Sequence, residues 1–291
     1  MTGTCAGRRF CRCGNVQRVE VQGRGTVLVD EGGDSMAGSA DNARVSIWYP
    51  EQYQGETNLA ATATQLTDSQ LASTRYSKSS AARGVLNEWI DFFAAGPTPI
   101  LHLRLSSRVP QELLNSLAGQ PQLESLELKW GSYSDLTALS KLTRLNRLSL
   151  GGAKKVIDFT PITKLSGLES LFIDGAFLAE DLRPLGTLTT LRELTYGSAH
   201  PGTDRNVTIP DFDWISPLVN LQRLWMPGIR LVHADVSVLA QIHSLVSIRL
   251  PLRRGYRKQV EQLASSHSAF AVLAKEYEAY DDYVARTAGS R

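Results

Sequence analysis

The chain has few cysteines, no long apolar run and almost no net charge. Its three cysteines, Cys5, Cys11 and Cys13, all precede residue 14. This excludes a disulfide framework and a cysteine nucleophile from the rest of the chain, and the three lack the two-pair spacing of a structural zinc site. No apolar run has the length of a membrane span, and the first 30 residues lack the apolar core of a signal peptide. We therefore expect a soluble, cytoplasmic protein without membrane contact.

The charges are nearly balanced, with 31 Lys and Arg against 29 Asp and Glu, so bulk electrostatics favours no nucleic-acid partner. One basic run extends from Arg249 to Lys258. It contains Tyr256 as its only ring for stacking on bases, and the acidic stretch 276–282 follows it. We interpret this run as the solvated edge of a domain and keep nucleic-acid binding there as an alternative.

The first 35 residues mix Arg, Gly and Val without periodicity, which is typical of disorder. The stretch "DEGGDS" lies directly before Met36, and its Glu-Gly-Gly codons resemble a ribosome-binding site. We hypothesise that the natural protein is bacterial and starts at Met36, so that 1–35 is either disordered or a leader that the protein lacks. The intact mass of the endogenous protein tests this.

One short pattern recurs through the middle of the chain, with apolar residues at positions 1, 4 and 6 of each unit. "LESLELKW" from Leu123 returns as "LNRLSLGG" from Leu145 and "LESLFIDG" from Leu168. Alternating apolar and polar residues predict a short strand in each unit, with its apolar side facing inward. Seven units, spaced by 22 to 30 residues, begin at Ile100, Leu123, Leu145, Leu168, Leu191, Leu221 and Leu245.

A second half-pattern follows most of these strands. It reads "DLTALSKL" from Asp135, "DFTPITKL" from Asp158 and "DLRPLGTL" from Asp181, with looser copies from Asp213 and Asp235. Apolar residues at every third position predict a short helical or 3₁₀ turn. The leading Asp predicts an N-cap for that turn, so we interpret these aspartates as structural.

These two half-patterns resemble the leucine-rich repeat family, and the Asp-Leu-x-Pro-Leu second half is similar to that of its internalin-like and phosphatase-regulator class. The asparagine that usually follows the strand is replaced by small residues or insertions. The resemblance covers about residues 98–252. It implies an α/β solenoid, a horseshoe of about seven repeats whose strands form one parallel sheet. In this family the concave face of the sheet binds partners.

Both ends of such a solenoid need a cover, and the flanking sequences predict helical caps. Leu86, Trp89, Ile90 and Phe93 follow a helical spacing, which predicts a capping helix over 80–95 that ends at Gly96. Ahead of this helix, Val45, Ile47 and Tyr49 alternate like a short strand, and 50–79 are polar without a clear pattern. The C-terminal cap is predicted from a helical stripe of Val260, Leu263, Phe270, Leu273 and Tyr277. The predicted divisions are therefore 1–35 (leader), 36–97 (N-terminal segment and capping helix), 98–252 (repeats) and 253–291 (C-terminal helical cap).

No catalytic or cofactor motif is evident, and we expect a non-catalytic protein that binds neither metal nor cofactor. The five histidines are scattered, and no glycine-rich phosphate loop has the required spacing. The alternative is a hydrolase or metal-dependent enzyme that uses the long fifth unit, where His200 shares an insertion with Asp204, Asp211 and Asp213. No metal-ligand spacing supports this alternative.

The outward residues of the strands form the candidate site. Two of them are aromatic, Phe172 and Trp225, and they lie two strands apart with Thr195 between them. An aromatic pair beside an unusual insertion is typical of a protein-binding hot spot. The alternative is that the insertion, 197–212, or the N-terminal segment covers the two rings. We predict a monomer that binds a protein partner through Phe172, Trp225, Thr195, Glu193, Arg223, Asp174, Arg147 and Lys129, and a toxin-neutralising or regulatory role is implied by family analogy alone.

Overall fold

The computed structural model describes residues 16–20, 26–30, 63–66, 79–198 and 205–288. The chain divides into two compact units, Met1–Asn42 and Ala43–Arg291, so the division falls after the predicted boundary at residue 35. In the first unit, β1 (Val16–Glu20) pairs antiparallel with β2 (Thr26–Asp30). Both strands lie within 1–35, the segment predicted to be disordered or a leader, and that interpretation stays a prediction; the Val and Thr residues of the two stretches favour extended backbone. The cysteines and the predicted strand around Ile47 lie outside the described residues.

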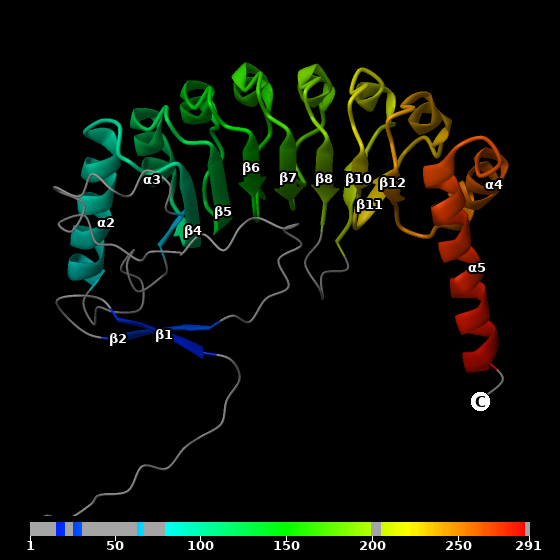
Figure 1. The fold of residues 1–291 in the computed structure, drawn as a ribbon, viewed down its shortest axis with the longest axis horizontal. Coiled ribbons are helices and arrows are strands. Elements are labelled where there is room, and N and C mark those ends of the chain that lie inside the picture. Colours follow the sequence, from blue (N-terminus) through cyan, green and yellow to red (C-terminus); the bar gives the residue numbers. More distant parts are fainter. Residues whose placement is uncertain (1–15, 21–25, 31–62, 67–78, 199–204, 289–291) are drawn as a thin grey trace, which may run out of the picture. The chain divides into compact units, whose positions relative to one another are not determined.

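The larger compact unit, Ala43–Arg291, is built on one parallel sheet in which each strand pairs with the strand of the next repeat (Figure 1). The seven predicted strands are all present. The sheet also contains β3 (Ala63–Leu66), which pairs with β4 inside a segment where the sequence shows no clear pattern. The predicted strands are β4 (His102–Val109), β5 (Ser125–Gly131), β6 (Arg147–Leu150), β7 (Ser170–Asp174), β8 (Glu193–Gly197), β10 (Arg223–Trp225) and β12 (Ser247–Arg249).

The strand register is the one that the repeat alignment predicts. Leu148 lies beside Leu126 on one side and beside Leu171 on the other, and the same step continues along the sheet. The residues at positions 1, 4 and 6 of all seven units are at most 7% exposed. The core is therefore a stack of equivalent leucines, each packed on its counterparts in the neighbouring coils.

Short 3₁₀ turns form the layer opposite the sheet, as the second half-pattern predicts. They are η2 (Thr137–Lys141), η3 (Thr160–Lys164), η4 (Arg183–Thr187), η5 (Asp213–Ile215) and η6 (Ser237–Gln241). In each, an Asp carboxylate accepts a hydrogen bond from the backbone N–H two residues later, and the acceptors are Asp135, Asp158, Asp181, Asp211 and Asp235. This satisfies an N–H that the turn itself leaves unpaired.

One capping residue was predicted wrongly. In the fifth unit the carboxylate that binds the turn belongs to Asp211, whereas the sequence alignment places Asp213 there. Asp213 is instead the first residue of η5, and its own N–H donates the hydrogen bond. The buried ring of Phe212 fills the place that Phe159 fills in an earlier unit, which fixes the true alignment.

The missing asparagines are replaced by direct backbone bonding between coils and by larger side chains. Ala153, fully buried, donates its N–H to the carbonyl of Asp174 in the next coil. The hydroxyl of Tyr133 donates to the Gly151 carbonyl at 2.8 Å, and the guanidinium of Arg253 donates to the Ile229 carbonyl at 2.9 Å. Small residues after the strand let the loops approach closely enough for these bonds.

Helices lie at both ends of the row of repeats (Figure 1). At one end α2 (Ser79–Ala94) covers nearly the predicted range and buries Trp89 and Phe93 completely, and α3 (Gln111–Ser116) and η1 (Leu117–Gly119) pack beside it. The fully buried Gln120 links the C-terminal end of α2 to the first repeats. Its amide donates to the carbonyls of Phe93 and Gly96 and accepts from Thr98.

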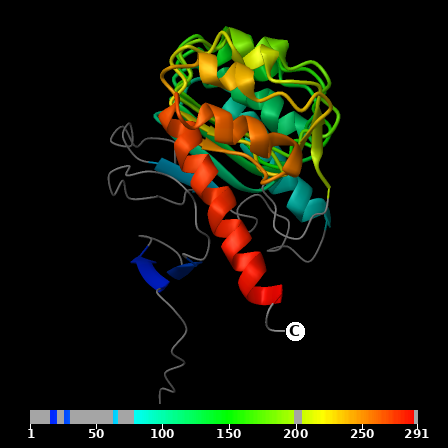
Figure 2. The ribbon, with the colours of Figure 1, turned by 90° about the vertical axis from the view of Figure 1, so that its right-hand side faces the viewer.

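At the other end the structure has two helices, α4 (Arg254–Leu263) and α5 (Ser268–Ala288), packed on each other. The sequence stripe was interpreted as one helical cap, but the chain leaves the helical path between residues 264 and 267. Phe270, Leu273 and Tyr277 of α5 are buried, and Figure 2 shows α5 continuing beyond the repeats.

Part of the long fifth unit is built into the solenoid. Its strand β9 (Val207–Ile209) pairs parallel with β11 (Ile229–Leu231) of the next unit, and this pair forms a separate two-stranded sheet. Val207 and Ile209 are buried, as is Phe212 at the end of the insertion. The extra length therefore adds a second strand to this coil rather than a loop that is solvated throughout.

Replacing a stacked leucine should destabilise the fold. Leu224 is 1% exposed, so Leu224→Ala should lower the free energy of unfolding by roughly 2–5 kcal/mol through the cavity it leaves. Urea denaturation measures this. The control is Arg192→Ala, which removes only the exposed ion pair with Glu169 and should cost less than about 1 kcal/mol. Equal losses in the two variants would contradict the predicted inward register.

The capping aspartates should make stability fall in acid. Hydrogen bonds from the Arg183 side chain and backbone lower the pKa of Asp181 to about 2, and bonds from Thr137 and Ser237 lower the pKa values of Asp135 and Asp235. A lowered folded-state pKa gives stability that is present above the unfolded pKa of about 3.9 and is lost as the pH falls through the folded value.

We therefore expect the Tm of the wild type to exceed that of Asp181→Asn near pH 5, and the difference to shrink toward pH 2. Thermal melts across this range measure the difference. Glu180→Gln, which removes an exposed neighbouring carboxylate that caps no turn, is the control and should lower the Tm near pH 5 less than Asp181→Asn does. A Tm difference between wild type and Asp181→Asn that is independent of pH would contradict the capping role.

Candidate functional site

The outward residues of the strands form two straight rows across the sheet. In Figure 1 the 3₁₀ turns lie on the outer side of the curved row of repeats and the strands on the inner side, which we call the concave face. The register places equivalent positions side by side. Position 3 contributes His102, Ser125, Arg147, Ser170, Glu193, Arg223 and Ser247, and position 5 contributes Arg104, Glu127, Ser149, Phe172, Thr195, Trp225 and Arg249.

The predicted aromatic pair lies in one of these rows. Phe172 pairs with Thr195, and Thr195 pairs with Trp225, so the two rings stand on strands about 10 Å apart. Both rings are half-buried, whereas Leu224 and Met226 on either side of Trp225 are buried in the core. Trp225 therefore projects from the concave face, with the small side chain of Thr195 between the two rings.

An ion pair borders the aromatic pair. The guanidinium of Arg223 binds the carboxylate of Glu193 on the neighbouring strand, and the hydroxyl of Ser170 lies 3.5 Å from that carboxylate. A second cross-strand pair, Arg104–Glu127 at 3.1 Å, lies toward the N-terminal end. These pairs neutralise the two glutamates of the face and order their side chains, although exposed pairs stabilise the fold little.

The remaining predicted site residues lie farther from the rings. Arg147 and Lys129 are exposed, and neither forms an ion pair with any other residue that the structure describes. Asp174 ends β7 beside Gly197 and is half-buried. The predicted residues thus occupy one continuous region of β5 to β10, and their use by a partner stays a prediction.

The alternative is that the insertion or the N-terminal segment covers Phe172 and Trp225. Residues 199–204 of the insertion and most of the N-terminal segment lie outside the described residues. The guanidinium of Arg205, the first described residue after this gap, lies 4.2 Å from the centre of the Phe177 ring at the ends of the strands. From Val207 onward the insertion packs into the solenoid through β9.

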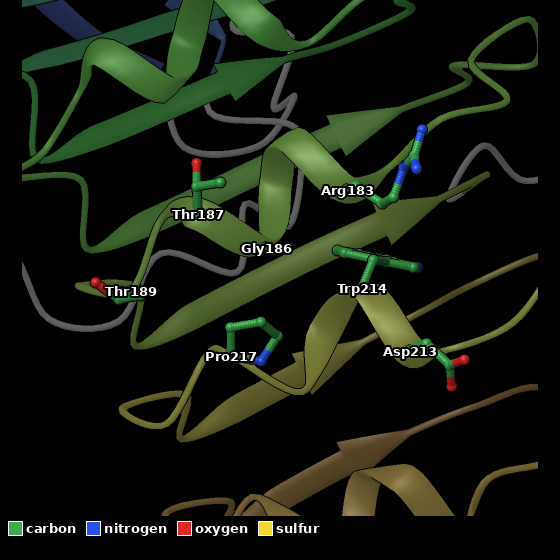
Figure 3. Close-up of a pocket in the computed structure, with 7 residues that line it drawn as sticks. All are labelled: Arg183, Gly186, Thr187, Thr189, Asp213, Trp214 and Pro217. Carbon is green, nitrogen blue, oxygen red and sulfur yellow. The ribbon is translucent and has the colours of Figure 1, made fainter.

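The enzymatic alternative finds no assembled site among the described residues. His200 and Asp204 lie outside them. Asp211 is occupied as a cap, and Asp213 lines a shallow hollow on the outer face between η4 and η5 (Figure 3). No histidine lines this hollow, and its Arg183 is held by Asp181. Within the described ranges no three His, Cys, Asp or Glu side chains gather where a metal ion would bind.

The basic run at the C-terminal end is partly built into the fold, which corrects its interpretation as a solvated edge. Tyr256 is 2% exposed, so its ring is not available for stacking on bases. Arg253 donates to Asn206 and Ile229, and Arg257 binds Glu261 and Asp281. These contacts join α4 to the last repeats and to α5.

Solved structures with a similar chain path are all leucine-rich repeat proteins. A repeat protein of Leptospira interrogans matches with a TM-score of 0.51 at 17% identity, over 70% of this chain and 46% of that one. The chain described here therefore has the leucine-rich repeat fold. Internalin C2 of Listeria monocytogenes matches at 20% identity over 57% of this chain and 69% of its own, with a TM-score of 0.41. The ectodomain of the Arabidopsis receptor kinase HAESA, solved with a peptide hormone, matches at 18% identity over 55% of this chain and 27% of its own, with a TM-score of 0.41.

No family model matches the chain, and no curated protein is similar to it in sequence. Among the described helices none is long and apolar enough to cross a membrane.

The sequence analysis missed one exposed aromatic residue. Trp130, at position 8 of the second repeat, is 45% exposed, more than any other Trp, Phe or Tyr described in the repeats. The outward rows were read only as far as position 7, because regular alternation ends there. The sequence signal that could have identified this residue is a large aromatic ring directly before Gly131, at the end of a predicted strand.

Trp225 should contribute little to folding compared with its neighbour. Trp225→Ala should lower the free energy of unfolding less than Leu224→Ala does, because the indole is half-buried and the leucine is fully packed. Urea denaturation of both variants makes the comparison. A larger loss for Trp225→Ala would mean that the ring is covered within the free protein.

Proposed function

We propose that the chain is a non-catalytic binding protein whose partner is another protein, held on the concave face around Phe172 and Trp225. One observation carries this proposal: two half-buried rings stand in register on strands two apart, with the small Thr195 between them. Rings held by a rigid sheet lose little conformational freedom on binding, so their burial by a partner yields affinity efficiently.

The neighbouring residues fit such an interface. The Arg223–Glu193 pair is ordered before binding and lies at the rim of the aromatic pair. Rim charges typically guide orientation and association rate more than they add affinity. We assign Phe172, Thr195 and Trp225 to the centre of the interface, and Glu193, Arg223, Asp174, Arg147 and Lys129 to its periphery. On this proposal the protein acts as a monomer in the cytoplasm.

Site-specific photo-crosslinking tests the proposed face. A photoreactive benzoylphenylalanine at Thr195 should crosslink a protein partner in extracts of the host, because this position lies between the two rings. The same amino acid at Thr189, exposed beside the outer-face hollow, is the matched control and should give no such product.

Truncation of the ring completes this test. Trp225→Ala should abolish the Thr195 crosslink while the Tm is retained, since a ring buried in an interface typically contributes about 2 kcal/mol or more to affinity. Crosslinking from Thr189 instead of Thr195 would assign the interface to the outer face. A crosslink unchanged in Trp225→Ala would remove the aromatic pair from the interface.

A further inference from the structure

A second set of side chains, three exposed and one half-buried (Phe177), lies at the edge of the solenoid where the strands end. It consists of Trp130, Lys154, Phe177 and Arg205, contributed by successive coils, and we call it the edge strip. Trp130 precedes the end of β5, Lys154 follows β6, Phe177 follows β7 and Arg205 precedes β9. The arrows of β5, β6 and β7 end along one edge in Figure 1.

The strip is continuous because glycines between its members bring the coils together. A side chain at Gly152 would meet the Cβ of Trp130 at 3.1 Å. A side chain at Gly175 would meet the Phe177 ring at 3.4 Å and the Lys154 stem at 3.8 Å, so both pack around this glycine. Arg205 then covers the Phe177 ring at 4.2 Å from its centre. Gly152 and Gly175 have φ values of +58° and +74°, which favour glycine.

Apolar exposure and positive charge coincide on this edge. Trp130 is 45% exposed, and Ile157 and Leu178 in the following loops are 62% and 50% exposed. Lys129, Lys154 and Lys155 are exposed too, and none forms an ion pair within the described part of the chain. With Arg205 they make four cations, against Asp158, Asp174, Glu180 and Asp181 in the same loops, so the loops carry no net charge. Asp158 and Asp181 accept hydrogen bonds from their turns, whereas the three lysines are bound by no carboxylate that the structure describes.

We propose that the edge strip is a docking surface for an acidic segment of a partner protein, with an apolar side chain of that segment covering Trp130. This rests on the proposed function, because Lys129 of the proposed concave site directly precedes Trp130 of the strip in β5, so that one partner could contact both surfaces. An exposed indole, with one unpaired lysine directly before it in β5 and two more in the loop after β6, matches an apolar anchor that is accompanied by carboxylates.

The same surface suits a nucleic acid less well. Arg205 already covers a face of the Phe177 ring, so Trp130 is the one ring of the strip open to base stacking. Single-stranded nucleic-acid sites instead combine several free rings with a groove of uniform positive charge.

Peptide selection on the full-length protein tests the proposal. A phage-displayed library of random 12-residue peptides is panned against the immobilised chain, and the recovered peptides are synthesised and titrated by fluorescence anisotropy. We expect peptides with two or more Asp or Glu residues around one apolar residue. The double variant Lys129→Glu/Lys154→Glu and the single variant Trp130→Ala should each lower their affinity at least tenfold.

The matched control keeps the charge change and moves it to the outer turns. Lys141→Glu/Lys164→Glu reverses two exposed lysines at the ends of η2 and η3 and should change affinity less than twofold. Thermal melts confirm that all variants fold. Recovery of no peptide, or of neutral or basic peptides, would overturn the proposal.

Two further outcomes separate this proposal from its rivals. Acidic peptides displaced with equal affinity by the oligonucleotide d(T)12 would show a surface for polyanions in general and would overturn a protein-specific strip. Peptides that lose affinity for Trp225→Ala but bind Lys129→Glu/Lys154→Glu normally would support the concave site and overturn the strip. The opposite pattern would support the strip and count against the aromatic pair.

Discussion

The structure depends on the hydrogen-bonded stacking of one coil on the next. Each inner strand of the eight-stranded sheet is flanked by two parallel neighbours, and the register of these strands aligns the apolar residues of positions 4 and 6 into continuous buried rows. No coil can bury its own apolar face, so every coil relies on its neighbours for a core. The same register determines what appears on the outside, because alternation places whatever residues occupy positions 3 and 5 into equally regular rows.

This constraint explains how a candidate binding surface arises without catalytic chemistry. The backbone of the sheet is fully engaged in the stack, so Phe172, Thr195 and Trp225 stand on a rigid support. The edge strip arises from the same stacking, because the glycines that follow the strands let successive loops approach within contact distance. Both surfaces are therefore consequences of the repeat geometry decorated with non-repeating side chains.

The two ends show where the regular pattern stops being informative. At the N-terminal end, Gln120 bonds to the carbonyls of Phe93 and Gly96, a contact between residues far apart in the sequence. The added strand β3 has no leucine pattern and is recognised only because β4 offers it an open edge. At the C-terminal end, Arg253 and Arg257 read as solvated charge, yet their partners come from other elements.

The sequence by itself determined the periodic part of this protein. The spacing of Leu123, Leu145 and Leu168 dictates the strand register, the inward rows and the outward rows that include Phe172 and Trp225, because alternation and stacking leave no other way to bury the leucines. The capping role of Asp135 and Asp181 follows from the same periodicity.

Only the tertiary structure decided the features that depend on contacts between coils or on interruptions of the period. It assigned the fifth cap to Asp211, built part of the insertion into β9, which pairs with β11 of the next repeat, and buried Tyr256. It also brought Trp130, Lys154, Phe177 and Arg205 together along one edge. Lys154 and Phe177 share position 10 of their units, but Trp130 and Arg205 stand at positions 8 and 15, so a repeat alignment does not place all four side by side. Their proximity results from loops of unequal length that meet only after the coils have stacked.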